Sequence, residues 1–201
     1  GKKNAKVNYQ VDLIDEIWED RPVLSEEPAF NLDVKYAGET VASKLARIRE
    51  EMKEAGTNVH VVSTLDDICW TLNIRGNDID FFPLVLSYGI ITMDSFELYI
   101  DERKLDDKLK AKLAKDGVNL HPYNDIYEDV KKFGSDVVAM IDPGKLNYAL
   151  FNNIPENVKT VKKRNPAILM KAIKNPVEIE NIRKAQIKDS VAHVRFMKWL
   201  K

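Results

Sequence analysis

Pairs of carboxylates are the first residues in this sequence whose types and spacing suggest chemistry. Two acidic side chains held close together can bind Mg²⁺ and support phosphodiester hydrolysis. The pairs are Asp66 with Asp67, Asp78 with Asp80, and Asp101 with Glu102. We expect the first pair in the first turn of a helix, where negative charge gains about 0.3–1 kcal/mol, and the last pair at the end of a strand. These positions explain the carboxylates without a metal, so we disfavour a nuclease.

The histidines and the candidate nucleophiles offer no catalytic arrangement. His60, His121 and His193 are scattered, with neither an i, i+4 partner nor H-E-x-x-H spacing. Cys69 falls on the apolar face of a predicted helix, where a thiol acts as a small hydrophobe, and Ser63 and Ser87 have no identifiable base. The turn around Gly144 lacks the second glycine and the Lys-Ser/Thr pair of a phosphate loop. We therefore expect no catalytic residue and no metal ligand in this chain.

Arg75 and Asp78 are the residues that we select as a candidate binding site. Thr64, with Asp67 three residues later, predicts a capping box, and the apolar residues Leu65, Ile68, Cys69 and Leu72 then share one helical face. The segment 73–77 should end this helix and leave Arg75 on an irregular turn, from which its side chain could point at a ligand. The alternative is a structural ion pair between Arg75 and Asp78.

The run from Trp70 to Asp78, W-x-x-N-x-R-G-x-D, resembles the second domain of three-domain Xaa-Pro aminopeptidases, in the creatinase/prolidase superfamily. The resemblance extends to the segments 11–22 and 167–192. It implies an α/β fold, related to ribonuclease H, with a mixed central sheet flanked by helices. It also implies that Arg75 and Asp78 lie on the substrate side. In that family a later catalytic domain binds two divalent ions, usually manganese, with two Asp, one His and two Glu; we expect no cofactor in this chain itself.

The hydrophobic periodicity independently predicts an α/β domain. Helical runs are expected at 39–54, 64–72, 105–115 and 124–132, and strands at 58–63, 83–92, 96–101, 118–121 and 136–141. The strands 83–92 and 96–101 are separated by a short turn and should form a hairpin. Alternation of helices and strands is typical of an α/β fold.

We divide the chain into three parts. Residues 1–33 are expected to be a linker from a preceding domain, because segment 11–33 holds eight acidic residues and the lone base Arg21. Residues 34–163 form the domain, and residues 164–201 form a second linker and the first helix of a truncated catalytic domain. The basic stretch 159–174 contains no acid, which indicates a solvated linker or a patch for nucleic acid.

Both ends suggest a piece of a longer protein. The chain starts with Gly1, so we expect that the natural N-terminus was removed. The helix expected from Pro176 onward carries apolar residues around its last turns, namely Phe196, Met197, Trp199 and Leu200. Their packing partner is expected in residues after 201; the alternative is a helix used for dimerisation.

Composition limits the partners and the location. The charges nearly cancel, with 31 basic and 32 acidic residues, so the strong field of a dedicated nucleic-acid binder is absent. The single Cys69 excludes an internal disulfide, and no apolar run is long enough to cross a membrane. We expect a cytoplasmic protein without a nucleic-acid or membrane partner.

The resemblance therefore implies a non-catalytic domain of a metal-dependent Xaa-Pro aminopeptidase. Such an enzyme removes the N-terminal residue from peptides with proline second, and this domain would shape the substrate cleft and contribute to homodimer contacts. One alternative is a catalytically dead relative that binds peptides or proteins. A less favoured alternative is a nucleic-acid-binding module.

Overall fold

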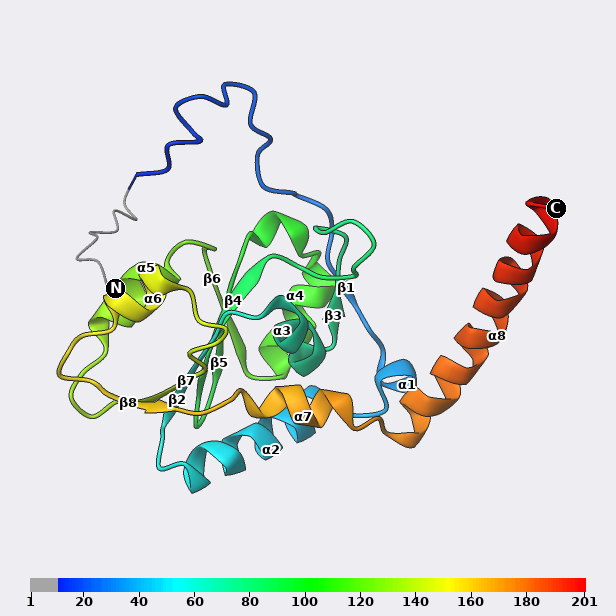
Figure 1. The fold of residues 1–201 in the computed structure, drawn as a ribbon. Helices are drawn as coiled ribbons and strands as arrows, with labels where there is room; N and C mark the ends of the chain where they lie inside the picture. Colours follow the sequence, from blue (N-terminus) through cyan, green and yellow to red (C-terminus); the bar gives the residue numbers. More distant parts are fainter. Residues whose placement is uncertain (1–10) are drawn as a thin grey trace, which may run out of the picture.

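The computed structural model describes residues 11–201, which form a six-stranded sheet covered by helices on both faces, with one long helix extending away (Figure 1). The first ten residues of the predicted linker lie outside the described range. The strands of the sheet are β2 (Val59–Val62), β4 (Ser87–Thr92), β5 (Phe96–Ile100), β6 (Val118–His121), β7 (Val138–Ile141) and β8 (Lys159–Lys162), in the order β6-β5-β4-β2-β7-β8. The sheet is mixed, because β4 pairs antiparallel with β2 and β5, whereas the other pairs are parallel. The predicted α/β class and mixed sheet are confirmed.

Alternating side chains divide the core between the two faces of the sheet. Phe96, Leu98 and Ile100 of β5 belong to one apolar cluster, which includes residues of α2 (Val41–Glu54), α3 (Leu65–Leu72), α4 (Asp107–Lys115) and α7 (Pro166–Ala172). Tyr99 belongs to the other cluster, under α5 (Ile126–Asp129), the 3-10 turn η2 (Val130–Lys132) and α6 (Tyr148–Asn153). This period of two is the pattern of a strand buried on both faces.

Most predicted elements are present, with shifted ends. The helix 39–54 is α2, whose face Val41, Leu45, Ile48 and Met52 is buried, and β4 and β5 form the expected hairpin. Strand β4 starts only at Ser87, and the predicted helix 124–132 is two short pieces, α5 and η2. Helix α6 follows the turn around Gly144. Within residues 11–201, no helix combines the length and apolar character needed to cross a membrane.

The prediction of a linker at 159–174 is wrong. Residues 159–162 form the edge strand β8, and α7 packs against α3. Lys163 pairs with Glu51 at 2.8 Å and Lys171 pairs with Asp66 and Asp67, so part of the basic charge is neutralised within the fold. Only the two middle side chains of β8 are half-buried, which weakens its hydrophobic signal in the sequence.

The segment 11–33 is only partly the extended linker that its composition suggests. Asp12 and Arg21 are joined by an ion pair of 2.9 Å across a series of turns. Near its end, β1 (Phe30–Asn31) pairs antiparallel with β3 (Ile74–Arg75). Arg75 therefore lies in a short strand, and the predicted irregular turn at this position is wrong.

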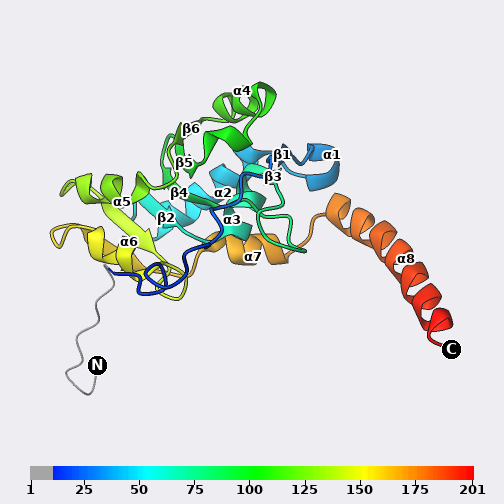
Figure 2. The same cartoon turned by 90° about the horizontal axis from the view of Figure 1, so that it is seen from above.

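Helix α8 (Pro176–Trp199) leaves the body of the molecule as a single rod (Figures 1 and 2). It has no buried residue, and Trp199 is 78% exposed. Its first turn is fastened to α1 (Val34–Ala37): the side-chain amide of Asn175 donates to the carbonyl oxygen of Ala37 at 2.8 Å. The predicted helix, its Pro176 in the first turn and its exposed apolar end are confirmed.

Gly38 is expected to control how α8 is attached. It has φ +71°, and a Cβ atom there would lie 2.2 Å from Oδ1 of Asn175. Gly56 has a similar φ of +65° but open space around it. We predict that Gly38→Ala and Gly56→Ala both lower the free energy of unfolding by about 1 kcal/mol, through the left-handed backbone. Only Gly38→Ala should speed amide hydrogen exchange in the first turns of α8; equal exchange in both variants would contradict this.

Candidate functional site

A cleft of about 360 Å³ lies at the carboxyl end of α3, between the body and the start of α8. Its walls come from α1, α2, α3, β3, α7 and α8, so segments far apart in the sequence meet here. The cations Lys44, Arg75, Lys171 and Lys174 line it, together with the carboxylates of Asp66 and Glu178. The candidate residue Arg75 is therefore in a cleft, as an arginine that meets a ligand must be.

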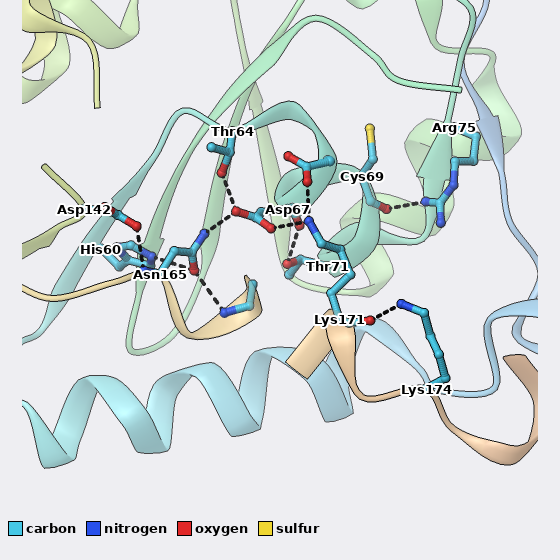
Figure 3. Close-up of polar contacts among 12 residues, drawn as sticks. His60, Thr64, Asp67, Cys69, Thr71, Arg75, Asp142, Asn165, Lys171 and Lys174 are labelled. Atoms are coloured by element: carbon cyan, nitrogen blue, oxygen red, sulfur yellow. Dashed lines mark hydrogen bonds and ion pairs between the residues drawn. The ribbon is translucent and has the colours of Figure 1, made fainter. Parts of the chain in front are cut away.

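Arg75 is held at the end of α3 by backbone carbonyls. Its Nη1 atom donates to the carbonyl oxygen of Cys69 at 2.8 Å (Figure 3). The same atom donates to the carbonyl oxygen of Ile74, also at 2.8 Å. Burial lowers the pKa of the guanidinium, which is partly opposed by the charge of Glu178. Among residues 11–201, the Nε and Nη2 atoms of Arg75 have no hydrogen-bond partner. Neutral carbonyl groups thus position the guanidinium, and its Nε and Nη2 donors remain available to a ligand.

Lys44 is a second cation at the same helix end, and sequence reasoning missed it. Its Nζ donates to the carbonyl oxygen of Trp70 at 2.8 Å and to Oδ1 of Asn73 at 2.7 Å, and it lies 4.3 Å from the centre of the Trp70 ring. Burial lowers the pKa of Lys44 to about 8. The sequence does contain a signal, because position 44 falls on the apolar face of the helix that carries Val41, Leu45 and Ile48.

A buried carboxylate at the other end of α3 fastens α7. Asp67 accepts from the hydroxyl of Thr64 at 2.6 Å, from Nδ2 of Asn165 at 2.9 Å and from Nζ of Lys171 at 2.7 Å (Figure 3). The predicted helix 64–72 is present and begins at Leu65, with Thr64 as its N-cap residue, but the capping box is wrong. The Thr64 hydroxyl binds the Asp67 side chain and makes no bond to the backbone of the helix.

His60 is buried beside this network. It faces away from Val59 and Val61, as the strand pattern predicts, with Nδ1 3.1 Å from the carbonyl oxygen of Met140 and Nε2 3.2 Å from Oδ1 of Asn165. A neutral imidazole carries one proton and can donate to only one of these acceptors. Burial lowers the pKa of His60, and the hydrogen bonds to Met140 and Asn165 and the charges of nearby carboxylates oppose this only in part. The residue has a structural role, joining β2 to β7 and to the start of α7.

Asp78 lies apart from the cleft. Its Oδ2 atom accepts from Nζ of Lys104 at 2.5 Å and from the backbone N–H of Leu86 at 2.7 Å, and both charged side chains are almost fully buried. The predicted alternative, an ion pair with Arg75, is therefore wrong. The buried pair with Lys104 fixes the start of the loop between β3 and β4.

The remaining candidates for chemistry have structural roles. The thiol of Cys69 is buried, which raises its pKa, and the hydroxyls of Ser63 and Ser87 donate to backbone carbonyls. His121 pairs with Glu97 at 2.6 Å, and His193 is exposed on α8. Across the described part of the chain, no three His, Cys, Asp or Glu side chains gather to hold a metal ion. Of these candidates only Cys69 lines the cleft, and its buried thiol is not activated.

The free energy of unfolding should depend on pH through His60. Its pKa is lowered in the folded state from the ordinary value of 6.5. Below about pH 6.5 the unfolded chain therefore binds a proton that the folded chain resists, so we predict that stability falls by up to about 1.4 kcal/mol per pH unit. Denaturant titrations between pH 7.5 and 5 check this, with His60→Gln as the control. Equal pH dependence of the two proteins would contradict the prediction.

Comparison with known proteins identifies the family. The family model of the creatinase/prolidase N-terminal domain matches residues 20–178. The chain is 36% identical to a probable Xaa-Pro aminopeptidase P of Neurospora crassa, over 94% of this chain and 29% of that protein. It is 38% identical to Xaa-Pro aminopeptidase 1 of Dictyostelium discoideum, over 94% of this chain and 30% of that protein. The chain thus spans about a third of the length of these relatives.

A solved structure confirms the fold. The X-prolyl aminopeptidase of Caenorhabditis elegans, described as a cytosolic enzyme with a di-nuclear active site, superposes with a TM-score of 0.91 and 34% identity. The match covers 96% of this chain and 32% of that one. An Xaa-Pro dipeptidase of Bacillus anthracis, 16% identical with a TM-score of 0.55, shares the fold alone. The resemblance to Xaa-Pro aminopeptidases is confirmed, and the chain belongs to the creatinase/prolidase N-terminal domain family.

Proposed function

We propose that this chain is the non-catalytic N-terminal-side domain of a metal-dependent Xaa-Pro aminopeptidase, which removes the N-terminal residue from peptides with proline second. The observation that carries the proposal is the TM-score of 0.91 over 96% of the chain, with 34% identity, to an X-prolyl aminopeptidase. Because the chain spans only about a third of that enzyme, the activity belongs to the longer protein.

The metal chemistry is proposed for the part of the protein outside this chain. Two divalent ions, which we take to be manganese, would polarise the scissile carbonyl and activate a water. Among residues 11–201 no three His, Cys, Asp or Glu side chains gather to hold a metal ion, and we propose that the catalytic domain of the longer protein supplies the ligands. We also propose a cytoplasmic location, as for the cytosolic relative, and a homodimeric enzyme.

Within that enzyme we propose that this domain shapes the substrate cleft and contributes to subunit contacts. Arg75 has donors free to meet a carboxylate or a peptide carbonyl, and the cleft that holds it opens where α8 leaves the body. Asp78 acts indirectly, because its pair with Lys104 fixes the loop that follows Arg75. We keep 34–163 as the domain and 164–201 as the connection to the catalytic domain, with α7 packed against the domain by Lys171 and Asp67.

The longer protein provides the test of the proposed activity. It should release the first residue from an Xaa-Pro peptide in the presence of Mn²⁺ and lose this activity with a chelator. The chain of residues 1–201 should release none under the same conditions. A longer protein that binds Xaa-Pro peptides without cleaving them would instead indicate a catalytically dead relative. Hydrolysis by the chain alone would overturn the proposal that this domain is non-catalytic.

Arg75→Ala should lower kcat/KM of the longer protein by about ten-fold or more, because a charged hydrogen bond to the peptide is worth about 1.5–3 kcal/mol. The manganese content should not change. Arg75 also ties the last turn of α3 to β3, so the unfolding midpoint must be measured on the same sample. A lower midpoint with unchanged kcat/KM would leave Arg75 a purely structural role. Arg49→Ala, which removes bonds to Thr92 and Ser95 at the hairpin turn, is the control for loss of a structural arginine.

A further inference from the structure

The loop between β3 and β4 presents an apolar finger, residues 79–82, to solvent. Phe81 is 102% exposed and Phe82 is 62% exposed, and Ile79 is exposed beside them. The loop extends from the body on the side from which α8 departs (Figures 1 and 2). Two neighbouring phenylalanine rings with so little burial contribute almost nothing to folding, and exposed apolar groups of this kind are typical of contact sites.

The finger is held in a defined shape. The backbone N–H of Phe82 donates to the carbonyl oxygen of Ile79 at 3.1 Å, and that of Leu84 donates to Phe82 at 2.7 Å. Phe81 has φ +67°, a left-handed conformation that favours glycine or asparagine in turns. At its base, Asp78 is anchored in the core by Lys104 and by the N–H of Leu86. The ring of Phe81 is thus exposed to solvent although its left-handed backbone conformation is unfavourable for a residue with a side chain.

The finger adjoins the cleft of Arg75. Leu84, two residues after Phe82, lines that cleft together with Lys44 and Arg75. Both cations donate only to neutral oxygens, those of Cys69, Ile74, Trp70 and Asn73. Asp66 and Glu178 also line the cleft, but neither contacts Lys44 or Arg75 directly, and Asp66 is paired with Lys171. Lys44 and Arg75 can therefore meet an anion, and the neighbouring finger can meet an apolar group.

We propose that the cleft and the finger together bind a peptide that bears a free carboxylate and an apolar side chain. The carboxylate meets the free Nε and Nη2 donors of Arg75, and the apolar side chain packs against Phe81 and Phe82. A four-residue finger is too small to carry a stable protein interface, which buries about 1,200–2,000 Å² in total, so a short peptide fits better than a folded partner. This inference rests on the proposed function, which makes peptides the ligand. It adds a preference for peptides that have a free carboxylate and an apolar side chain.

The test is direct binding of synthetic peptides to this chain, followed by NMR titration. The reference peptide is Ala-Pro-Gly-Leu-Phe with a free carboxylate. One comparison peptide carries a C-terminal amide, and the other, Ala-Pro-Gly-Ser-Ser, lacks the apolar side chains. Each change should weaken binding by about five-fold or more, because each removes one contact worth about 1 kcal/mol. No binding of the reference peptide, or equal binding of all three, would overturn the proposal.

Variants separate the two halves of the site. Phe81→Gly removes a ring at a position where glycine adopts the backbone freely, so it should weaken binding of the reference peptide without lowering the unfolding midpoint. Arg75→Gln should abolish the preference for the carboxylate over the amide. Phe151→Ala removes a phenylalanine that is 42% exposed on α6 and should change nothing. If Phe81→Gly alters only self-association, the finger contacts a second copy and the proposal fails.

The same peptides distinguish this proposal from the proposed function. If the longer protein cleaves no Xaa-Pro peptide, the proposed activity fails, while peptide binding to this chain still decides the present inference. Conversely, the longer protein could cleave peptides at equal rates with and without apolar residues after the proline, while this chain binds none of them. That result would support the proposed activity and refute the finger as a binding element.

Discussion

The carboxylate of Asp67 is the interaction on which the arrangement of the helices depends most. It is 1% exposed and joins the start of α3 to Asn165 and Lys171, which lie about a hundred residues later in the chain. An isolated carboxylate at this depth would cost several kcal/mol, and breaking one partner of such a pair costs about 3–5 kcal/mol. Three donors, from Thr64, Asn165 and Lys171, stabilise the buried carboxylate of Asp67. Because two of these donors belong to the start and the body of α7, they also hold α7 on α3.

With α7 in place, the carboxyl end of α3 becomes one wall of a cleft. The carbonyl oxygens at this end accept from Lys44 and Arg75, and the helix dipole favours both cations there. No carboxylate contacts either cation directly, although Glu178 lines the same cleft. The same contacts that end the helix therefore also place two cations in the cleft.

Helix α8 and the finger both carry apolar side chains outside the core, and the first turns of α8 line this cleft. Helix α8 is attached through Asn175 and Ala37 and carries its apolar side chains in solvent. The finger at 79–82 is attached through Asp78 and Lys104. In each case a polar anchor fixes an element whose apolar surface is left free. The residues that hold these elements in place therefore differ from the apolar residues that they leave free for contacts.

The sequence by itself determined the features that depend on neighbours along the chain. The apolar face of α2, the hairpin of β4 and β5 and the first turn of α8 at Pro176 all follow from local spacing. The tertiary structure decided the features that depend on distant partners. Two-residue strands such as β1 and β3 have no periodicity to detect, and they exist only because they pair. Likewise, Asp78 forms its ion pair with Lys104 and not with Arg75, and Lys44 is buried. Long-range packing decides both, because it brings together residues that are far apart in the sequence.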